Sequence, residues 1–152
     1  MLAMGGFSGI GQILHRYFDF LTPGIRDDRG KMVCGFPPSY IENESLRIGA
    51  YRKLAVQDSE QSLNELHEEF VDRFGKMPES AELMFTYTLI KLLGSERGFR
   101  SISLAGEILS MSDGQKVYKK ADGRLPRISL KNPPELRLAL IIRELKGIPC
   151  LR

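Results

Sequence analysis

Glycine, tyrosine and lysine residues at two places have the spacing of a dinucleotide-dependent active site. Gly5, Gly9 and Gly11 have the spacing of a dinucleotide-binding loop. Tyr87 and Lys91 form the Y-x-x-x-K pair found with that loop in short-chain dehydrogenases. Such a loop requires a buried strand before it and an acidic residue about 20 residues later, at the end of a second strand. Only Met1 to Met4 precede the first glycine and no parallel strands follow, so the sequence argues against a dehydrogenase.

Histidine, cysteine and lysine residues elsewhere offer no stronger catalytic pattern. The histidines, His15 and His67, each stand alone on a predicted helix, whereas a zinc site needs several ligands at short spacing. No Gly-Lys pair has the preceding glycine of a P-loop, so we expect no motor motif, catalytic residue, metal site or cofactor in this chain. The cysteines, Cys34 and Cys150, are too few for a disulfide framework. This favours a reducing cytoplasm, with a single bridge between them as the open alternative.

The stretch EEFVDRFGKMPES, residues 68–80, concentrates acids, a base, aromatics, glycine and proline. Glu68 and Glu69 are neighbours on a predicted helix and point about 100° apart, which does not suit a paired acid and base. Glu69 and Arg73 have the spacing of a helix ion pair. Gly75 suits the end of a helix, and Pro78 suits the first turn of the next. The stretch therefore predicts a helix end, a corner and a helix start.

The elements around that corner follow from hydrophobic spacing. Asn43 is a predicted cap for a helix over residues 44–55, and Asp58 or Ser59 opens a second helix that ends at Phe74. One face of the second helix is apolar, and this predicts a buried position for its members: Leu63, Leu66, Phe70 and Phe74. The third helix, from Pro78 to about residue 93, is apolar on nearly every face, which predicts a central position.

Short alternating runs separated by turn residues follow Gly98. The runs at residues 100–104, 107–111, 116–119 and 127–130 predict a small antiparallel meander. Pro133 and Pro134 then open a last helix that Gly147 closes, and its apolar residues are Leu136, Leu140, Ile141 and Leu145. The predicted fold class is α+β, with helices packed on this small meander in a single compact domain.

The N-terminal part of the chain has a different pattern. Apolar residues at spacings of three and four predict an amphipathic helix over residues 7–21, and residues 22–30 read as a linker before a short strand at residues 31–36. We therefore divide the chain into residues 1–35, an N-terminal helix and linker, and residues 36–152, the compact domain. The N-terminal stretch is interrupted by polar residues well before the roughly 20 apolar residues of a membrane span.

Charge is distributed unevenly. Residues 58–82 contain eight acids and two bases, a balance of −6 that should repel nucleic acid. Residues 113–131 contain six bases and two acids, a balance of +4 that could contact phosphates. The candidate nucleic-acid contacts are Lys116, Lys119, Lys120, Arg124 and Arg127. The alternative is a solvated hairpin whose lysines prevent aggregation.

The segments YIENESLRIGAYRKLA and LHEEFVDRFGKMP occur in order between residues 40 and 78. Together they resemble the C-terminal domain of the bacterial transcription-repair coupling factors, and the resemblance covers roughly residues 36–104. The residues that match the two family motifs are Tyr40, Ile41, Arg47, Tyr51, Arg52, Asp72, Arg73, Phe74, Gly75 and Pro78. The chain departs from the family pattern at Glu42-Asn43, where Pro-Asp is usual, and at residues 87–90, which replace a basic segment.

The resemblance implies a regulatory, non-catalytic fragment of a larger protein. The family's parent is an ATP-dependent DNA translocase, using ATP and magnesium, that acts on stalled RNA polymerase in transcription-coupled nucleotide excision repair. Its C-terminal domain masks the UvrA-binding surface of an N-terminal UvrB-like module, and residues 1–35 would be the connector from the motor. The candidate interface residues are Arg47, Arg52, Glu68, Asp72 and Arg73. The rival functions are a small nucleic-acid-binding module that uses residues 116–131 and a small enzyme with a deep polar pocket.

Overall fold

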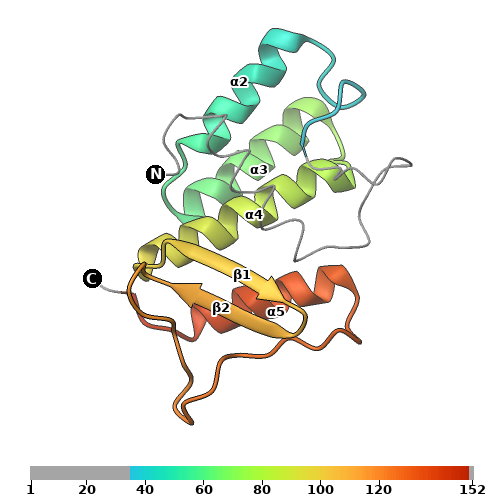
Figure 1. Cartoon of the computed structure of the whole chain (residues 1–152). Coiled ribbons are helices and arrows are strands. Elements are labelled where there is room, and N and C mark those ends of the chain that lie inside the picture. The colour runs from blue at the N-terminus through green and yellow to red at the C-terminus, as the bar shows by residue number, and fades with distance from the viewer. Residues whose placement is uncertain (1–34, 151–152) are drawn as a thin grey trace.

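A computed structural model describes residues 35–150 of the chain (Figure 1). The predicted N-terminal helix, the linker and most of the predicted strand at residues 31–36 lie outside the described residues, as does His15. Of that predicted strand, Gly35 and Phe36 are described and are not in a strand. Phe36 is buried, so the compact part of the chain includes this residue.

Two helices begin at the predicted side-chain caps. Helix α2 spans Glu44–Ala55, and the Asn43 side chain accepts a hydrogen bond from the Leu46 N–H at 3.0 Å. Helix α3 spans Glu60–Phe74, and the Ser59 hydroxyl accepts one from the Ser62 N–H at 3.1 Å. These bonds satisfy backbone donors that the first turn of a helix leaves unpaired, which is why short polar residues mark both starts.

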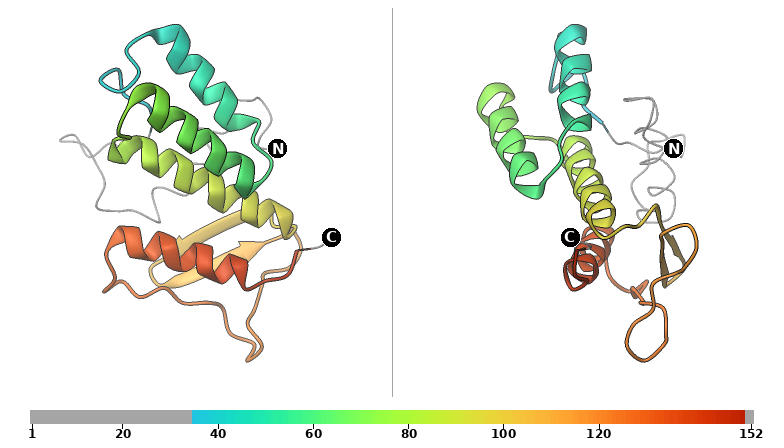
Figure 2. Two further views of the ribbon diagram at one scale, coloured as in Figure 1. Left: turned by 180° about the vertical axis from the view of Figure 1, so that it is seen from behind. Right: turned by 90° about the vertical axis from the view of Figure 1, so that its left-hand side faces the viewer.

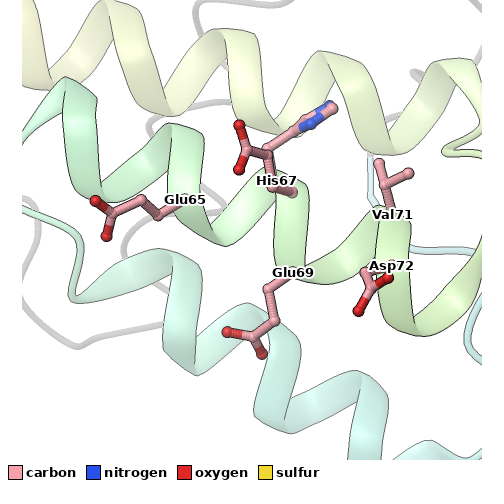
Figure 3. A pocket seen from close by; sticks show the side chains of 6 residues that line it. Glu65, His67, Glu69, Val71 and Asp72 are labelled. Carbon is pink, nitrogen blue, oxygen red and sulfur yellow. The ribbon is translucent and has the colours of Figure 1, made fainter.

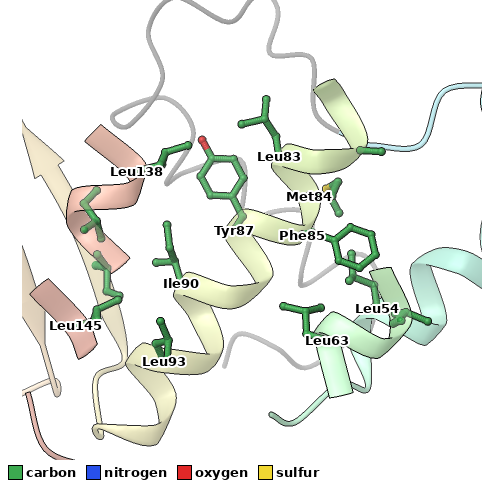
Figure 4. Packing of buried hydrophobic residues seen from close by; sticks show 14 of the residues in the cluster. Leu54, Leu63, Leu83, Met84, Phe85, Tyr87, Ile90, Leu93, Leu138 and Leu145 are labelled. Atoms are coloured by element: carbon green, nitrogen blue, oxygen red, sulfur yellow. The ribbon is translucent and has the colours of Figure 1, made fainter. Parts of the chain in front are cut away.

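Helix α4, Glu79–Glu96, is the central element of the core. Leu54 and Leu63 pack near Phe85 on one side of α4, while Leu138 and Leu145 lie on its other side (Figure 4). Tyr87 and Ile90 are fully buried. A helix with partners on opposite sides needs apolar residues around most of its circumference, and this explains the apolar sequence of α4.

A hairpin of two antiparallel strands follows α4. Strands β1, Ser101–Ala105, and β2, Ile108–Ser112, pair in a register that places Ser103 opposite Ser110. Side chains alternate between buried and more exposed positions, as period-two spacing predicts. Helix α5, Pro134–Lys146, covers one face of the hairpin (Figures 1 and 2). The buried hairpin residues on the core side are Ile102, Leu104, Leu109 and Met111.

The expected third and fourth strands are reduced to single bridges. Val117 bridges Ser112, and Arg127 bridges Ile108, both beside β2. The predicted strand at residues 116–119 stops pairing with β2 early, because the Lys120 N–H donates to the Arg124 carbonyl and closes a local turn. The α+β fold class is confirmed, while the predicted meander is a two-stranded hairpin with two flanking bridges.

Three residues from the predicted apolar faces are less buried than their spacing suggested, and one of them, Leu140, is only partly buried. Leu136 is 44% exposed, because the buried stripe of α5 consists of Leu138, Ile141 and Leu145, and a residue two positions before Leu138 points away from that stripe. Phe74 is half-buried at the end of α3, where it packs against the core without being enclosed.

Candidate interaction surfaces

The corner between α3 and α4 is held by the first tyrosine of the predicted motif. The Tyr40 hydroxyl lies 3.1 Å from the Phe70 carbonyl and 3.2 Å from the Gly75 carbonyl, both of which accept from it. Its ring packs against the edge of Phe74, with centroids 5.8 Å apart. Gly75 has φ of +92°, a conformation that favours glycine. We call Tyr40, Phe70, Phe74, Gly75 and Pro78 the motif corner.

Burial, and then the nearby carboxylate of Glu82, raise the pKa of Tyr40 above its ordinary value. The hydroxyl therefore stays protonated and remains a donor to the carbonyls at the end of α3. These bonds join the segment before α2 to the end of α3, so Tyr40 has a structural role here.

Two more motif residues are also engaged inside the fold. The Phe36 N–H donates to the Tyr51 hydroxyl at 2.8 Å, and the two rings lie 4.8 Å apart. The Arg47 guanidinium donates to the carbonyls of Ile41 and Glu42 at 2.9 and 3.1 Å. Arg47 therefore holds the chain that leads into α2, and this use competes with its predicted role as an interface residue.

The predicted ion pair between Glu69 and Arg73 is replaced by other contacts. Glu69 accepts from Lys53 of α2 at 2.8 Å, because its side chain points toward α2 rather than along α3 (Figure 3). The Arg73 guanidinium lies over the Phe74 ring, 5.2 Å from its centroid. Pro78 is the residue before α4, not a member of its first turn, and its ψ of 164° is extended.

Acidic side chains without an ion pair among the described residues lie along the outer surface of α3, where Glu65 accepts a hydrogen bond from Gln61 at 3.2 Å. Glu65, Glu68 and Asp72 are all exposed, and so is Val71, at 39%. A depression on this surface has its described lining entirely from α3: Glu65, His67, Glu68, Glu69, Val71 and Asp72 (Figure 3). Within residues 35–150 the lining comes from this one helix, so the described part of the chain presents these carboxylates as a charged helix surface. We call Glu65, Glu68 and Asp72 the acidic face.

The described histidine and cysteine are not arranged for catalysis or metal binding. His67 lies 2.6 Å from a carboxylate oxygen of Glu82 and packs against the edge of Phe85, so it links α3 to α4. Cys150 is an exposed free thiol. Within residues 35–150, no cluster of three histidine, cysteine or acidic side chains could hold a metal ion. No helix in the same range has the length and apolarity required to cross a membrane.

The basic loop, residues 113–131, presents all six of its lysines and arginines to solvent. Its two acids are used by the backbone. Asp113 accepts from the N–H groups of Lys116 and Gln115, which lowers the pKa of its carboxyl, and Asp122 accepts from the Arg124 N–H at 2.8 Å. Arg127 differs from the other predicted contacts because it lies 3.3 Å from Glu107.

Two structural arginines were missed by sequence reasoning. Arg97 donates to the carbonyls of Leu145, Ile148 and Leu93, and thereby joins the ends of α4 and α5. Arg137 is 3% exposed and donates to the Gly106 carbonyl at 2.7 Å. Apart from Leu93, their acceptors lie more than 30 residues away in the sequence, so no local pattern identifies these partners.

Comparison with known proteins identifies the same motif region. The family model of the TRCF domain matches residues 31–122. Among curated transcription-repair-coupling factors, that of Helicobacter pylori is 30% identical over 89 residues, covering 57% of this chain and 9% of the relative. That of Mycobacterium tuberculosis is 32% identical over 92 residues, covering 60% of this chain and 8% of the relative. The chain thus spans less than a tenth of the length of these relatives.

Among solved structures, the fold is similar to a crystal structure of the C-terminal domain of a transcription-repair coupling factor. The TM-score is 0.54 at 16% sequence identity, and the match covers 76% of this chain and 90% of that one. The α+β arrangement of residues 35–150 is therefore a known fold of this kind of domain. Because the family model also matches more than half of the sequence, the chain belongs to the TRCF domain family.

Proposed function

We propose that this chain is a regulatory interaction domain that masks the UvrA-binding surface of an N-terminal UvrB-like module in the same parent protein. The parent would be an ATP-dependent DNA translocase that acts with RNA polymerase and DNA in the bacterial cytoplasm. ATP and magnesium would serve its motor, and the domain itself would need no cofactor. The observation that carries the proposal is the acidic face, a row of exposed carboxylates without ion pairs among the described residues, on the outside of a helix whose opposite side is buried.

The rigid support beneath the acidic face favours a binding role. Phe70 is 1% exposed and contacts the rings of Phe36, Phe74 and Phe85. The face is thus attached to the most aromatic part of the core and keeps its shape when unbound. A preformed surface loses little conformational entropy on binding, and a complementary basic surface would be recognised mainly through charge.

Free charges also suit a contact that must be released. Interfaces between domains of one chain are more polar than permanent interfaces. A mask held by about 2 kcal/mol leaves only a few per cent of the partner surface open, so a modest competing interaction can release it. An acidic face made of exposed carboxylates supplies interactions of this size.

The groups with shifted pKa values do not favour the rival enzyme function. Tyr40 and Lys91 are shifted chiefly by burial, while Glu107 and Asp113 are shifted chiefly by backbone hydrogen bonds. An active site would gather such groups in one pocket. None of the four lines the depression on α3.

Calorimetric titration with charge reversals tests the proposal. The whole chain is titrated into the isolated N-terminal UvrB-like module of its parent, first unmodified and then as the double variant Glu68→Lys and Asp72→Lys. We expect binding of the unmodified chain and a loss of at least about tenfold in affinity for the variant, because two favourable charges become repulsive.

A matched double variant on α5 serves as the control. Glu135→Lys and Glu144→Lys change the net charge by the same amount on a different helix, away from the acidic face. This control should bind within about threefold of the unmodified chain, since screening by salt weakens distant charges. Equal losses of affinity for the α3 and α5 double variants would mean that only net charge matters. Unchanged affinity for the α3 double variant would show that the acidic face is not part of the interface.

A further inference from the structure

The basic loop projects from the molecule on the side away from α2 and α3 (Figures 1 and 2). It is anchored beside β2, where the Tyr118 N–H donates to the Met111 carbonyl and the Leu109 N–H donates to the Pro126 carbonyl. The Tyr118 ring packs against Phe99 near the base of the loop. The segment between these anchors extends into solvent, with its position fixed at both ends.

The tip of the loop is a tight turn whose two ends are basic residues. The Lys120 N–H donates to the Arg124 carbonyl, and the Gly123 N–H donates to the Lys120 carbonyl, both at 2.8 Å. Gly123 has φ of +82°, which suits the tight turn. The backbones of Lys120 and Arg124 are therefore paired across the turn, and both basic side chains are exposed at the tip.

Acids near the loop do not neutralise this pair. The Asp113 and Asp122 carboxylates are directed to backbone N–H groups, and Glu107 accepts from Arg127 and from the Leu130 N–H. Arg100 lies alongside Gly114 at the base and adds another exposed cation. Within residues 35–150, five of the six bases of the loop have no ion pair: Lys116, Lys119, Lys120, Arg124 and Lys131.

We propose that the basic loop binds the phosphate backbone of duplex nucleic acid without reading its sequence. Flexible lysine side chains act as point charges and suit a row of phosphates. The tip residues between Lys120 and Arg124 are Ala121, Asp122 and Gly123, which provide no large apolar side chain to enter a membrane. Helix α3, which carries the acidic face, lies apart from the loop, so it does not obstruct a polyanion there (Figure 1).

Fluorescence anisotropy with a labelled duplex DNA of about 20 base pairs tests this proposal through its salt dependence. Four phosphate contacts predict a slope of about −3.6 in log affinity against log salt, or roughly 150-fold weaker binding at about 200 mM than at about 50 mM salt. The double variant Lys120→Gln and Arg124→Gln should flatten the slope by about 1.8, because two contacts are lost.

The control replaces one lysine and one arginine elsewhere. Lys76→Gln and Arg143→Gln remove the same charge from exposed positions outside the loop and should leave the slope unchanged. Equal slopes for the two double variants would overturn the proposal, as would the absence of duplex binding at about 50 mM salt. A parallel arm with vesicles containing phosphatidylserine separates the sources of negative charge. Vesicle binding without duplex binding would also overturn the proposal.

Discussion

The motif corner, together with the neighbouring Arg73, and the basic loop each contain a tyrosine, a glycine, a proline and an arginine, but their polar groups are used in opposite ways. In the corner, the Tyr40 hydroxyl bonds carbonyls at the end of α3, and Arg73 lies over the Phe74 ring. In the loop, the acids bond the backbone and the bases point into solvent. The difference follows from the apolar spacing around each region. Polar residues beside the buried stripe of a helix contact the fold, whereas those in a turn-rich segment remain available to a partner.

If the motif corner is structural, substitutions in it should lower the unfolding free energy of the domain. Phe70→Ala should therefore have the largest effect, a loss of about 3–5 kcal/mol in unfolding free energy, because it removes a buried ring and leaves a cavity. Urea unfolding measures the loss. Val71→Ala, at the neighbouring exposed position, should change the unfolding free energy by less than about 1 kcal/mol. Similar losses at the two positions would mean that the aromatic cluster is not a packed core.

A smaller change probes the end of α3 alone. Tyr40→Phe keeps the ring and removes the hydroxyl that bonds the Phe70 and Gly75 carbonyls, so the unfolding free energy should fall by about 1 kcal/mol. Tyr118→Phe is the matched control in the basic loop, where the ring packs on Phe99. Urea unfolding should place the control within about 0.5 kcal/mol of the unmodified chain. Equal losses would argue that the corner hydroxyl has no special role.

The exposed bases of the basic loop should contribute to DNA binding and not to the stability of the fold. The variant Lys120→Gln and Arg124→Gln should leave the unfolding free energy within about 0.5 kcal/mol of the original value, because both side chains are exposed and only their backbones make the turn. Urea unfolding of the same preparations used for DNA binding checks this. A larger loss of unfolding free energy would mean that these side chains of the basic loop have a structural role, as those of the motif corner do.

The smallest effect is a pH dependence where the loop meets the hairpin. Bonds from the Leu130 N–H and then from Arg127 lower the pKa of Glu107 below its ordinary value of 4.5. The ionised carboxylate therefore adds stability above pH 4.5, and this is lost as pH falls through the lower folded pKa.

Glu107→Gln should remove that contribution. The unfolding free energies of the variant and the unmodified chain should differ above pH 4.5 and converge at lower pH. Urea unfolding over a pH series measures this, with Glu68→Gln on the exposed surface of α3 as the control. A difference that stays constant with pH would indicate that the Glu107 bonds do not depend on its charge.

Local patterns predicted most helices of the fold and fewer of its long-range contacts. The caps of α2 and α3 could be read from Asn43 and Ser59, because capping involves residues three positions apart. The extent of the sheet could not be read, because the closing of the loop at Lys120 competes with pairing along β2. Arg97 was missed for a related reason, since its acceptors on α5 and beyond become neighbours only after folding.

The candidate surfaces show the same limit. The charges of residues 58–82 and 113–131 were evident from the sequence, and the described parts of both reach the surface. Which charges are free was not evident. Glu69 is used by Lys53, Arg47 by two carbonyls and Arg127 by Glu107, and each of these contacts joins residues whose proximity depends on the folded chain.

Competition for the UvrB-like module tests the masking proposal most directly. The whole chain is bound to the isolated module in the calorimeter, and UvrA is then added in increasing amounts. The account predicts saturable binding of the chain to the module and its progressive displacement by UvrA, because the two share one surface. Binding of UvrA to the intact complex without displacement would contradict the account, and so would the absence of any binding between the chain and the module.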